Sequence, residues 1–288
     1  MFAAFRALQQ LSNTQREAIE SKQVSGAYPP SLLLDNLRAL SEFDRLADKW
    51  RRTATIAAPI LAVAAVFTLM ISLHTTTYLL PLPIALLVAA VVIAVSFFRL
   101  RPLDISNNVR GVALPFLAIL KQDIAATDRV RVRLDLALPT DKRKQVEVLP
   151  AYVRGQYHKV IDTLFADPWF EGSARLADGT VLRWRVRDDV RESKRTKRNR
   201  RGKYKTKTRH YKRSEIAVVV SLPSKRYVVH DVAGSAGQRV TVRRDVKRCT
   251  IKLQRKLKLK SLEPIDPRFL IDAISAAYRS ATPVGSAA

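Results

Sequence analysis

A cluster of positive charge is the part of this sequence best suited to chemistry. Residues Arg191–Arg213 include 13 Lys or Arg and one acid, Glu192. Ammonium and guanidinium groups at this density bind phosphate and carboxylate oxygens through charge-assisted hydrogen bonds. We call this segment the basic arm and expect these members to bind an anionic partner: Lys194, Arg195, Lys197, Arg198, Arg200, Arg201, Lys203, Tyr204, Lys205, Lys207, Arg209, Tyr211, Lys212 and Arg213.

Two forms of the basic arm fit its sequence. Asn199-Arg200-Arg201-Gly202 has the composition of a turn, and cations alternate with other residues from Lys203 to His210, as they do in a strand. This pattern predicts a long β-hairpin. A disordered polybasic loop has the same composition, so the sequence leaves both forms open.

Three kinds of partner would be attracted by such an arm. Anionic lipid headgroups gain about 1 kcal/mol per Lys or Arg near the surface, and an acidic protein surface uses the same charges. Structured RNA would add stacking on Tyr204, His210 and Tyr211, but the usual nucleic-acid-binding signatures are missing from the sequence. We expect lipid or acidic protein first. RNA or ribosome contact is the alternative, and an enzyme acting on an anionic substrate is the third.

The other polar residues favour binding over catalysis. The four histidines lack metal-ligand spacing, and there is no Gly-rich phosphate loop. Asp188–Asp189 and His230–Asp231 come nearest to acid–base pairs, but adjacent strand residues point to opposite faces. We expect the two aspartates to balance nearby arginines. The sequence thus predicts no enzyme, no cofactor and no metal, and Cys249 alone cannot form a disulfide within the chain.

The positive charge continues along several alternating segments. Residues 129–138, 180–187, 239–243 and 250–260 alternate apolar and basic side chains, which indicates half-buried strands. Arg255 is an exception, on an apolar side. The strands are expected to pair into a mainly antiparallel sheet with one basic outer face, made of Arg129, Arg131, Arg133, Arg183, Arg185, Arg187, Arg239, Arg243, Lys252, Lys256, Lys258 and Lys260.

The remaining segments predict flanking helices, further strands and a hairpin. Apolar residues recur every three or four positions in the helical segments, and Pro115 should kink one of them. We expect helices at 2–23, from Ser31 into the first apolar run, at 106–126 and at 266–278, with a break at 24–30, a strand or short helix at 159–165, a central strand at 216–222 and a hairpin turning at Ala177-Asp178-Gly179. The helix at 106–126 fits the membrane surface and the sheet equally well. Trp169 and Trp184 are expected in the core.

Two uncharged apolar runs predict a membrane hairpin. Thr53–Leu73 and Tyr78–Phe98 contain no Asp, Glu, Lys or Arg, and about 20 apolar residues cross ~30 Å of hydrocarbon. The connecting turn His74–Thr77 is also uncharged, whereas Lys or Arg lies beside both outer ends. The excess of positive charge marks the cytoplasmic side, so both termini are expected in the cytoplasm, with Trp50 and Tyr78 at the two interfaces.

These patterns divide the chain. We expect N-terminal cytoplasmic helices over 1–52, the transmembrane hairpin over 53–98, a basic cytoplasmic domain over 99–279 that carries the arm 191–213, and a disordered tail over 280–288. The fold class is an α+β membrane protein, with a two-helix hairpin and a mainly antiparallel sheet. Nearly all of the net charge of +26 falls in the cytoplasmic domain.

Three short runs also resemble a known group of sequences. Asp167-Pro168-Trp169, Arg175-Leu176-Ala177-Asp178-Gly179 and the run from Lys197 to Lys205 are similar to those of uncharacterised bacterial inner-membrane proteins with two spans and a basic cytoplasmic domain. The resemblance covers roughly residues 50–260. It implies this architecture and a bacterial inner-membrane location, and it carries no activity or site residues.

Overall fold

A computed structural model describes residues 2–75, 81–230 and 237–284 of the chain. The chain forms two compact units. One comprises Met1–Ser21 and Arg38–Ile105, and the other comprises Lys22–Leu37 and Ser106–Ala288. The predicted turn residues 76–77 and the predicted interface residue Tyr78 lie outside the described residues.

The first unit begins with two helices where one was predicted. α1 (Phe2–Gln10) and α2 (Asn13–Ser21) are separated at Ser12. The Ser12 hydroxyl accepts from the Gln15 backbone N–H at 3.3 Å, and the Gln15 side chain accepts from the Ser12 N–H at 3.0 Å. This reciprocal pair is a capping box, which starts a new helix at this point. The prediction of one helix over 2–23 is therefore wrong.

Two long apolar helices follow. α3 (Pro30–Thr75) runs without interruption from the amphipathic segment into the first apolar run, as predicted, and α4 (Pro81–Leu100) contains most of the second run. Both are long and apolar enough to cross a membrane by length and composition. Many of their apolar side chains are exposed, including Ile56 and Phe67, each at 64%. Trp50 donates its indole N–H to Ser96 across the helix pair at 3.1 Å.

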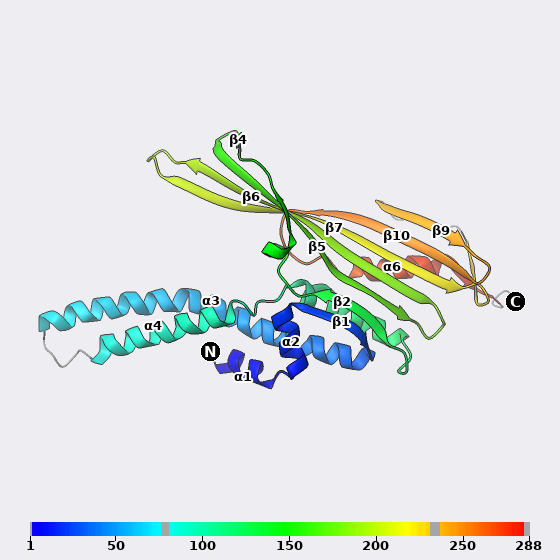
Figure 1. Ribbon diagram of the computed structural model, residues 1–288, viewed down its shortest axis with the longest axis horizontal. Coiled ribbons are helices and arrows are strands. Elements are labelled where there is room, and N and C mark those ends of the chain that lie inside the picture. Colours follow the sequence, from blue (N-terminus) through cyan, green and yellow to red (C-terminus); the bar gives the residue numbers. More distant parts are fainter. Residues whose placement is uncertain (1, 76–80, 231–236, 285–288) are drawn as a thin grey trace. The chain divides into compact units, whose positions relative to one another are not determined.

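The second unit is built on an antiparallel sheet (Figure 1). Its strand order is β1-β2-β5-β6-β7-β10-β9, and the short strands β3 and β4 pair with β5. The bounds are β1 (Gln23–Tyr28), β2 (Val130–Asp135), β3 (Gln145–Val148), β4 (Tyr152–Arg154), β5 (Tyr157–Arg175), β6 (Val181–Arg198), β7 (Tyr204–Pro223), β9 (Gln238–Arg244) and β10 (Arg248–Leu259). The predicted strands and the hairpin at Asp178-Gly179 are confirmed, and 159–165 is strand rather than helix.

The sheet takes one edge strand from the N-terminal part of the chain. β1 pairs along its length with β2, with Gln23 opposite Asp135 and Tyr28 opposite Val130. The predicted break between helices at 24–30 is confirmed, and most of it is the strand β1, which the sequence did not predict. Gly26 and the mixed composition of this segment hid a strand whose partner lies about 100 residues away in sequence.

Helices cover one face of the sheet. η2 (Val109–Ala113) is a π-helical turn that leads directly into α5 (Leu114–Leu120). Pro115 has no N–H for the regular ladder, which accounts for the irregular turn where a kinked helix was predicted. The ring of Phe116 on α5 packs 5.2 Å from Trp184 and 5.9 Å from Phe170, so this helix docks on the sheet.

The closing helix α6 (Arg268–Arg279) covers the same face and buries Leu270. Its Phe269 ring lies 4.5 Å below the guanidinium of Arg255, which explains an arginine on the apolar side of β10. Trp169 and Trp184 are 1% and 3% exposed, and their predicted place in the core is confirmed.

The segment after α6 is partly a strand. β11 (Ala281–Pro283) pairs with β8 (Tyr227–Val229), so the prediction of a disordered tail from residue 280 is wrong for these residues, and 285–288 lie outside the described residues.

Asp178, in the β5–β6 turn, accepts hydrogen bonds from the hydroxyls of Tyr227 and Tyr278 at 2.9 and 2.8 Å. Burial alone would raise the pKa of Asp178, but the hydrogen bonds from Thr180, Tyr278 and Tyr227 together lower it.

Candidate anion-binding face of the sheet

The strand register gathers basic side chains on the face that the helices leave uncovered. Arg183 on β6 lies opposite Val219 on β7, which lies opposite Lys252 on β10. Because directly opposite residues share a face, these pairs define one surface, which we call the open face. Its cations include Arg131, Arg133, Arg183, Arg185, Arg187, Arg213, Arg239, Arg243, Lys252, Lys256 and Lys258. The predicted basic face is thus assembled from five strands.

Few of these cations are neutralised within the chain. Arg185 lies 2.8 Å from Glu171, and Arg187 lies 3.0 Å from Asp189. Arg183 and Lys252 are exposed and have no ion-pair partner in the part of the chain that the structure describes. An exposed cation without an ion-pair partner in the protein is available to pair with an external anion.

The open face contains a basic hollow around small apolar residues. A cavity of about 360 Å³ is lined by Ala217 and Val219 of β7, with Arg183, Arg185 and Lys252 beside them. Successive same-face residues on a strand are about 6.6 Å apart, and neighbouring strands are about 4.8 Å apart. Guanidinium and ammonium groups on this grid line the hollow together with Glu215 and Gln254, and the cations can share one or more phosphate-sized anions.

The basic arm is an ordered hairpin formed by the outer halves of β6 and β7. Arg191 pairs with Tyr211 and Arg198 with Tyr204, and 199–203 form the turn. The Asn199 carboxamide oxygen accepts the backbone N–H groups of Arg201 and Lys203 at 3.0 and 2.9 Å, and Gly202 has φ +77°. The hairpin form is therefore confirmed over the loop form.

Most of the predicted arm cations are accessible. Lys194, Arg198, Arg200, Arg201, Lys203, Lys205, Lys207, Arg209 and Arg213 are exposed, as is Tyr204, and Lys197 and Tyr211 are half-buried. Lys194 is paired with Glu192 at 3.0 Å, and Lys197 reaches Gln156 at 3.5 Å.

Two predicted binding residues lie inside the protein instead. Arg195 is 9% exposed and donates to the hydroxyls of Ser193 and Tyr211 at 3.1 and 2.9 Å. The Lys212 side chain is fully buried beside Asp188, at 3.5 Å, and donates to the Glu263 carbonyl. These two side chains stabilise the root of the arm and do not meet solvent.

Lys212 belongs to a buried ionic cluster that the sequence did not predict. Asp167 on β5 lies directly opposite Asp188 on β6, and both are at most 1% exposed. Lys144 reaches Asp167 at 2.7 Å and Asp135 at 3.3 Å. The register of β5 slips just after Asp167, where Pro168 lacks an N–H for the ladder. Asp188 therefore balances a lysine and not an arginine, whereas Asp189 pairs with Arg187 as predicted.

Desolvation dominates the titration of Asp167. Burial raises the pKa of this carboxyl from 3.8 to about 6, although the charge and hydrogen bond of Lys144 lower it, while the nearby charges of Asp188 and Asp135 add to the rise. By the strand register, Asp167, Asp188 and Lys212 lie on the helix-covered face, so their charges are directed away from the open face.

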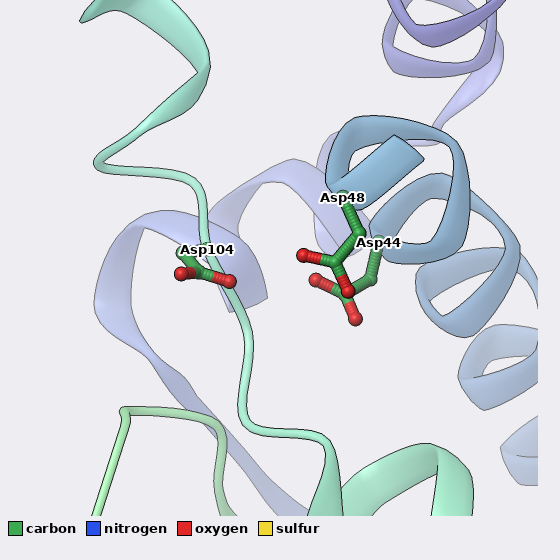
Figure 2. Close-up of side chains that lie close together, drawn as sticks. All are labelled: Asp44, Asp48 and Asp104. Carbon is green, nitrogen blue, oxygen red and sulfur yellow. The ribbon is translucent and has the colours of Figure 1, made fainter. Parts of the chain in front are cut away.

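A second ionic cluster occurs in the first unit. Figure 2 shows Asp44 and Asp48 of α3 with their carboxylates close to that of Asp104, a donor set that suits a divalent cation. Arg51 already lies among them, 2.6 Å from Asp48, 2.7 Å from Asp104 and 3.7 Å from Asp44. Its guanidinium also donates to the Leu100 carbonyl at 3.3 Å. An internal cation therefore satisfies these carboxylates, and Arg51 joins α3 to the segment after α4.

Two of the histidines, His210 and His230, have structural partners. His210 lies 3.2 Å from Glu192 on the arm, and His230 lies 2.9 Å from Thr282 between β8 and β11. Asp231, the other member of a predicted pair, lies outside the described residues.

No family model, curated protein or solved structure matches the chain. The resemblance to bacterial two-span proteins stays a prediction.

Proposed function

We propose that this chain is an integral protein of a bacterial inner membrane that binds anionic lipid headgroups through the open face and the basic arm. The single observation that carries the proposal is the register, which places exposed Arg and Lys from β2, β6, β7, β9 and β10 on one uncovered surface. A binding protein rather than an enzyme fits a surface of this kind, where cations outnumber acids.

The two apolar helices support the membrane location. Their length and composition suit a bilayer, and their exposed apolar side chains would be costly in water. Positive charge beside both outer ends favours cytoplasmic termini. A protein held in this way meets headgroups at high effective concentration, so that weak contacts add up to stable binding.

The composition of the open face favours headgroups over RNA. Bases are held by stacking on exposed aromatic rings. Tyr211 lies on the open face, and the guanidiniums of Arg191 and Arg195 already lie 4.8 and 5.8 Å from its ring centroid. Tyr204, at the arm tip, is in edge contact with His158 at 5.1 Å. Phosphate recognition needs only the cations.

The test uses the full chain in nanodiscs of phosphatidylcholine and measures its binding to separate vesicles that contain phosphatidylglycerol. Replacing Arg131, Arg183 and Lys252 by Gln should weaken binding by about tenfold, which corresponds to ~1.4 kcal/mol, because exposed charge pairs contribute a few tenths of a kcal/mol or more each.

A matched control removes the same charge from the other side of the sheet. Lys121, Arg268 and Arg279 are exposed cations in or beside the helices that cover the opposite face. Their replacement by Gln should leave vesicle binding nearly unchanged. Equal losses in the two variants would show that total charge, and not the open face, determines binding.

A further inference from the structure

A second and larger hollow lies on the open face where the arm leaves the sheet. Its volume is about 750 Å³, within the range of small-molecule sites. Strands β5, β6, β7 and β10 run side by side here (Figure 1) and supply most of its lining, with Val146 of β3 at one side. We call it the β5–β10 hollow.

Two rows of residues cross this hollow from strand to strand. One row consists of Ala166 on β5, Asp189 on β6, Arg213 on β7 and Lys258 on β10, and each residue lies directly opposite the next. In the next row Leu164 lies opposite Arg191, which lies opposite Tyr211. All seven residues line the hollow. The rows therefore show how polarity changes across the sheet.

The β5 end of the hollow is apolar. Leu164 and Ala166 lie on β5, and Val146, on neighbouring β3, is 68% exposed. Val146, Leu164 and Ala166 thus form an apolar patch on a face that is otherwise highly charged. An apolar ligand that packs on this patch would remove its own apolar surface from water.

The β10 end is cationic. Arg213, Lys258 and Lys260 are exposed, and none of them has an ion-pair partner among residues 2–75, 81–230 and 237–284. Asp189, the carboxylate in the lining, forms an ion pair with Arg187 at 3.0 Å. Three strand spacings separate the two ends, about 14 Å.

We propose that the β5–β10 hollow binds a single amphiphilic anion, a fatty acid or another acidic lipid with an aliphatic chain. The anionic head lies against Arg213, Lys258 and Lys260, and the chain extends over Tyr211 and Arg191 toward Leu164 and Val146. This site deepens the proposed function, because it adds a pocket for a single amphiphilic anion to the open face, which is proposed to contact many lipid headgroups.

The lining also selects against other anions. The described residues that line the hollow include no Ser, Thr, Asn or Gln to read the edge of a base or the hydroxyls of a sugar. The Tyr211 ring is occupied by guanidiniums, as described above, so a nucleotide finds no stacking partner. A small inorganic anion would leave the aliphatic end unused.

The test uses the full chain in phosphatidylcholine nanodiscs and a diazirine-bearing palmitate, with the crosslinked peptides identified by mass spectrometry. We expect labelling of β5 around Leu164–Ala166 in addition to labelling of the apolar helices. A diazirine-bearing hexadecanol, which lacks the charge, should label only the helices, and excess palmitate should remove the β5 signal.

Two variants examine the site from its two ends. Replacing Arg213, Lys258 and Lys260 by Gln should reduce the β5 signal by about tenfold, or ~1.4 kcal/mol. Ala166→Trp fills the hollow and leaves every cation in place, and it should reduce the signal as strongly, with retained folding checked by circular dichroism. Arg131, Arg183 and Lys252 lie outside the hollow, so replacing them by Gln should leave the signal unchanged.

The outcomes separate this site from the proposed function. The variant in which Gln replaces Arg131, Arg183 and Lys252 is expected to lose vesicle binding and keep the β5 label. Absence of the β5 label, an equal label from the neutral alcohol, or a label that survives Ala166→Trp would overturn the amphiphile site, whatever the vesicle experiment shows.

Discussion

Two regions of the same sheet hold their cations in opposite ways. On the open face, Arg183 and Lys252 are exposed and have no ion-pair partner within the described ranges, whereas at the bulge in β5 Lys144 and Lys212 each lie against a buried aspartate. Both regions contribute to the same large net charge. Pairing and burial, and not the number of charges, therefore separate the cations that stabilise the protein from those that can bind a partner.

Removing a buried lysine should have the largest effect. In Lys212→Met, Asp188 is left buried without its cation, which typically costs about 3–5 kcal/mol of the free energy of unfolding. Thermal and urea unfolding of the full chain in detergent measure the loss. The adjacent Arg213→Gln, on the exposed side of the same strand, should change stability by no more than about 0.5 kcal/mol. Similar losses in the two variants would contradict the distinction.

The pH dependence of stability gives a second test of the cluster. Because the pKa of Asp167 is raised from 3.8 to about 6 in the folded protein, the folded state holds a proton that the unfolded state has already lost between these two values. The contribution of Asp167 to the free energy of unfolding is therefore greatest below pH 4, falls through this window and levels off above pH 6.

Asp167→Asn should remove this fall. The difference in unfolding free energy between the parent chain and the variant should decrease by about 3 kcal/mol from pH 3 to 8, since each pKa unit corresponds to ~1.4 kcal/mol. Asp189→Asn is the matched control and should show no comparable decrease. A constant difference for Asp167→Asn would mean that this carboxyl titrates normally.

The arm tip should give the smallest effect. Arg200 and Arg201 lie in the hairpin turn, beyond the strand rows that form the open face. Arg200→Gln with Arg201→Gln should weaken vesicle binding only about threefold, at a few tenths of a kcal/mol per charge, and should leave the unfolding midpoint unchanged. A loss as large as that of the open-face variant would move the main binding surface to the arm.

The sequence predicted the surface better than it predicted the partners of single residues. Alternation in 180–187 and 250–260 placed Arg183 and Lys252 on outer faces correctly, because the period of a strand is regular. The same alternation did not reveal that Lys212 meets Asp188, since this contact depends on the register between two strands and on which face the helices cover. Arg195 was missed in the same way: its partner Tyr211 lies across the hairpin.

Long-range pairing limited the other predictions. β1 is short and contains Gly26, and its strand character comes from β2, far along the chain. The cluster around Arg51 was also hidden, because in the sequence this arginine precedes one apolar run while its partner Asp104 follows the other. Local patterns identify helices and strands; contacts between distant segments identify sites.

The central claim is that the open face binds anionic headgroups, and a salt series with a competitor tests it most directly. The full chain in phosphatidylcholine nanodiscs is mixed with phosphatidylglycerol vesicles at increasing salt, with and without structured RNA. The account predicts binding that weakens steeply with salt and that RNA displaces only slightly. Binding that RNA abolishes, or no binding to the vesicles at low salt, would contradict it.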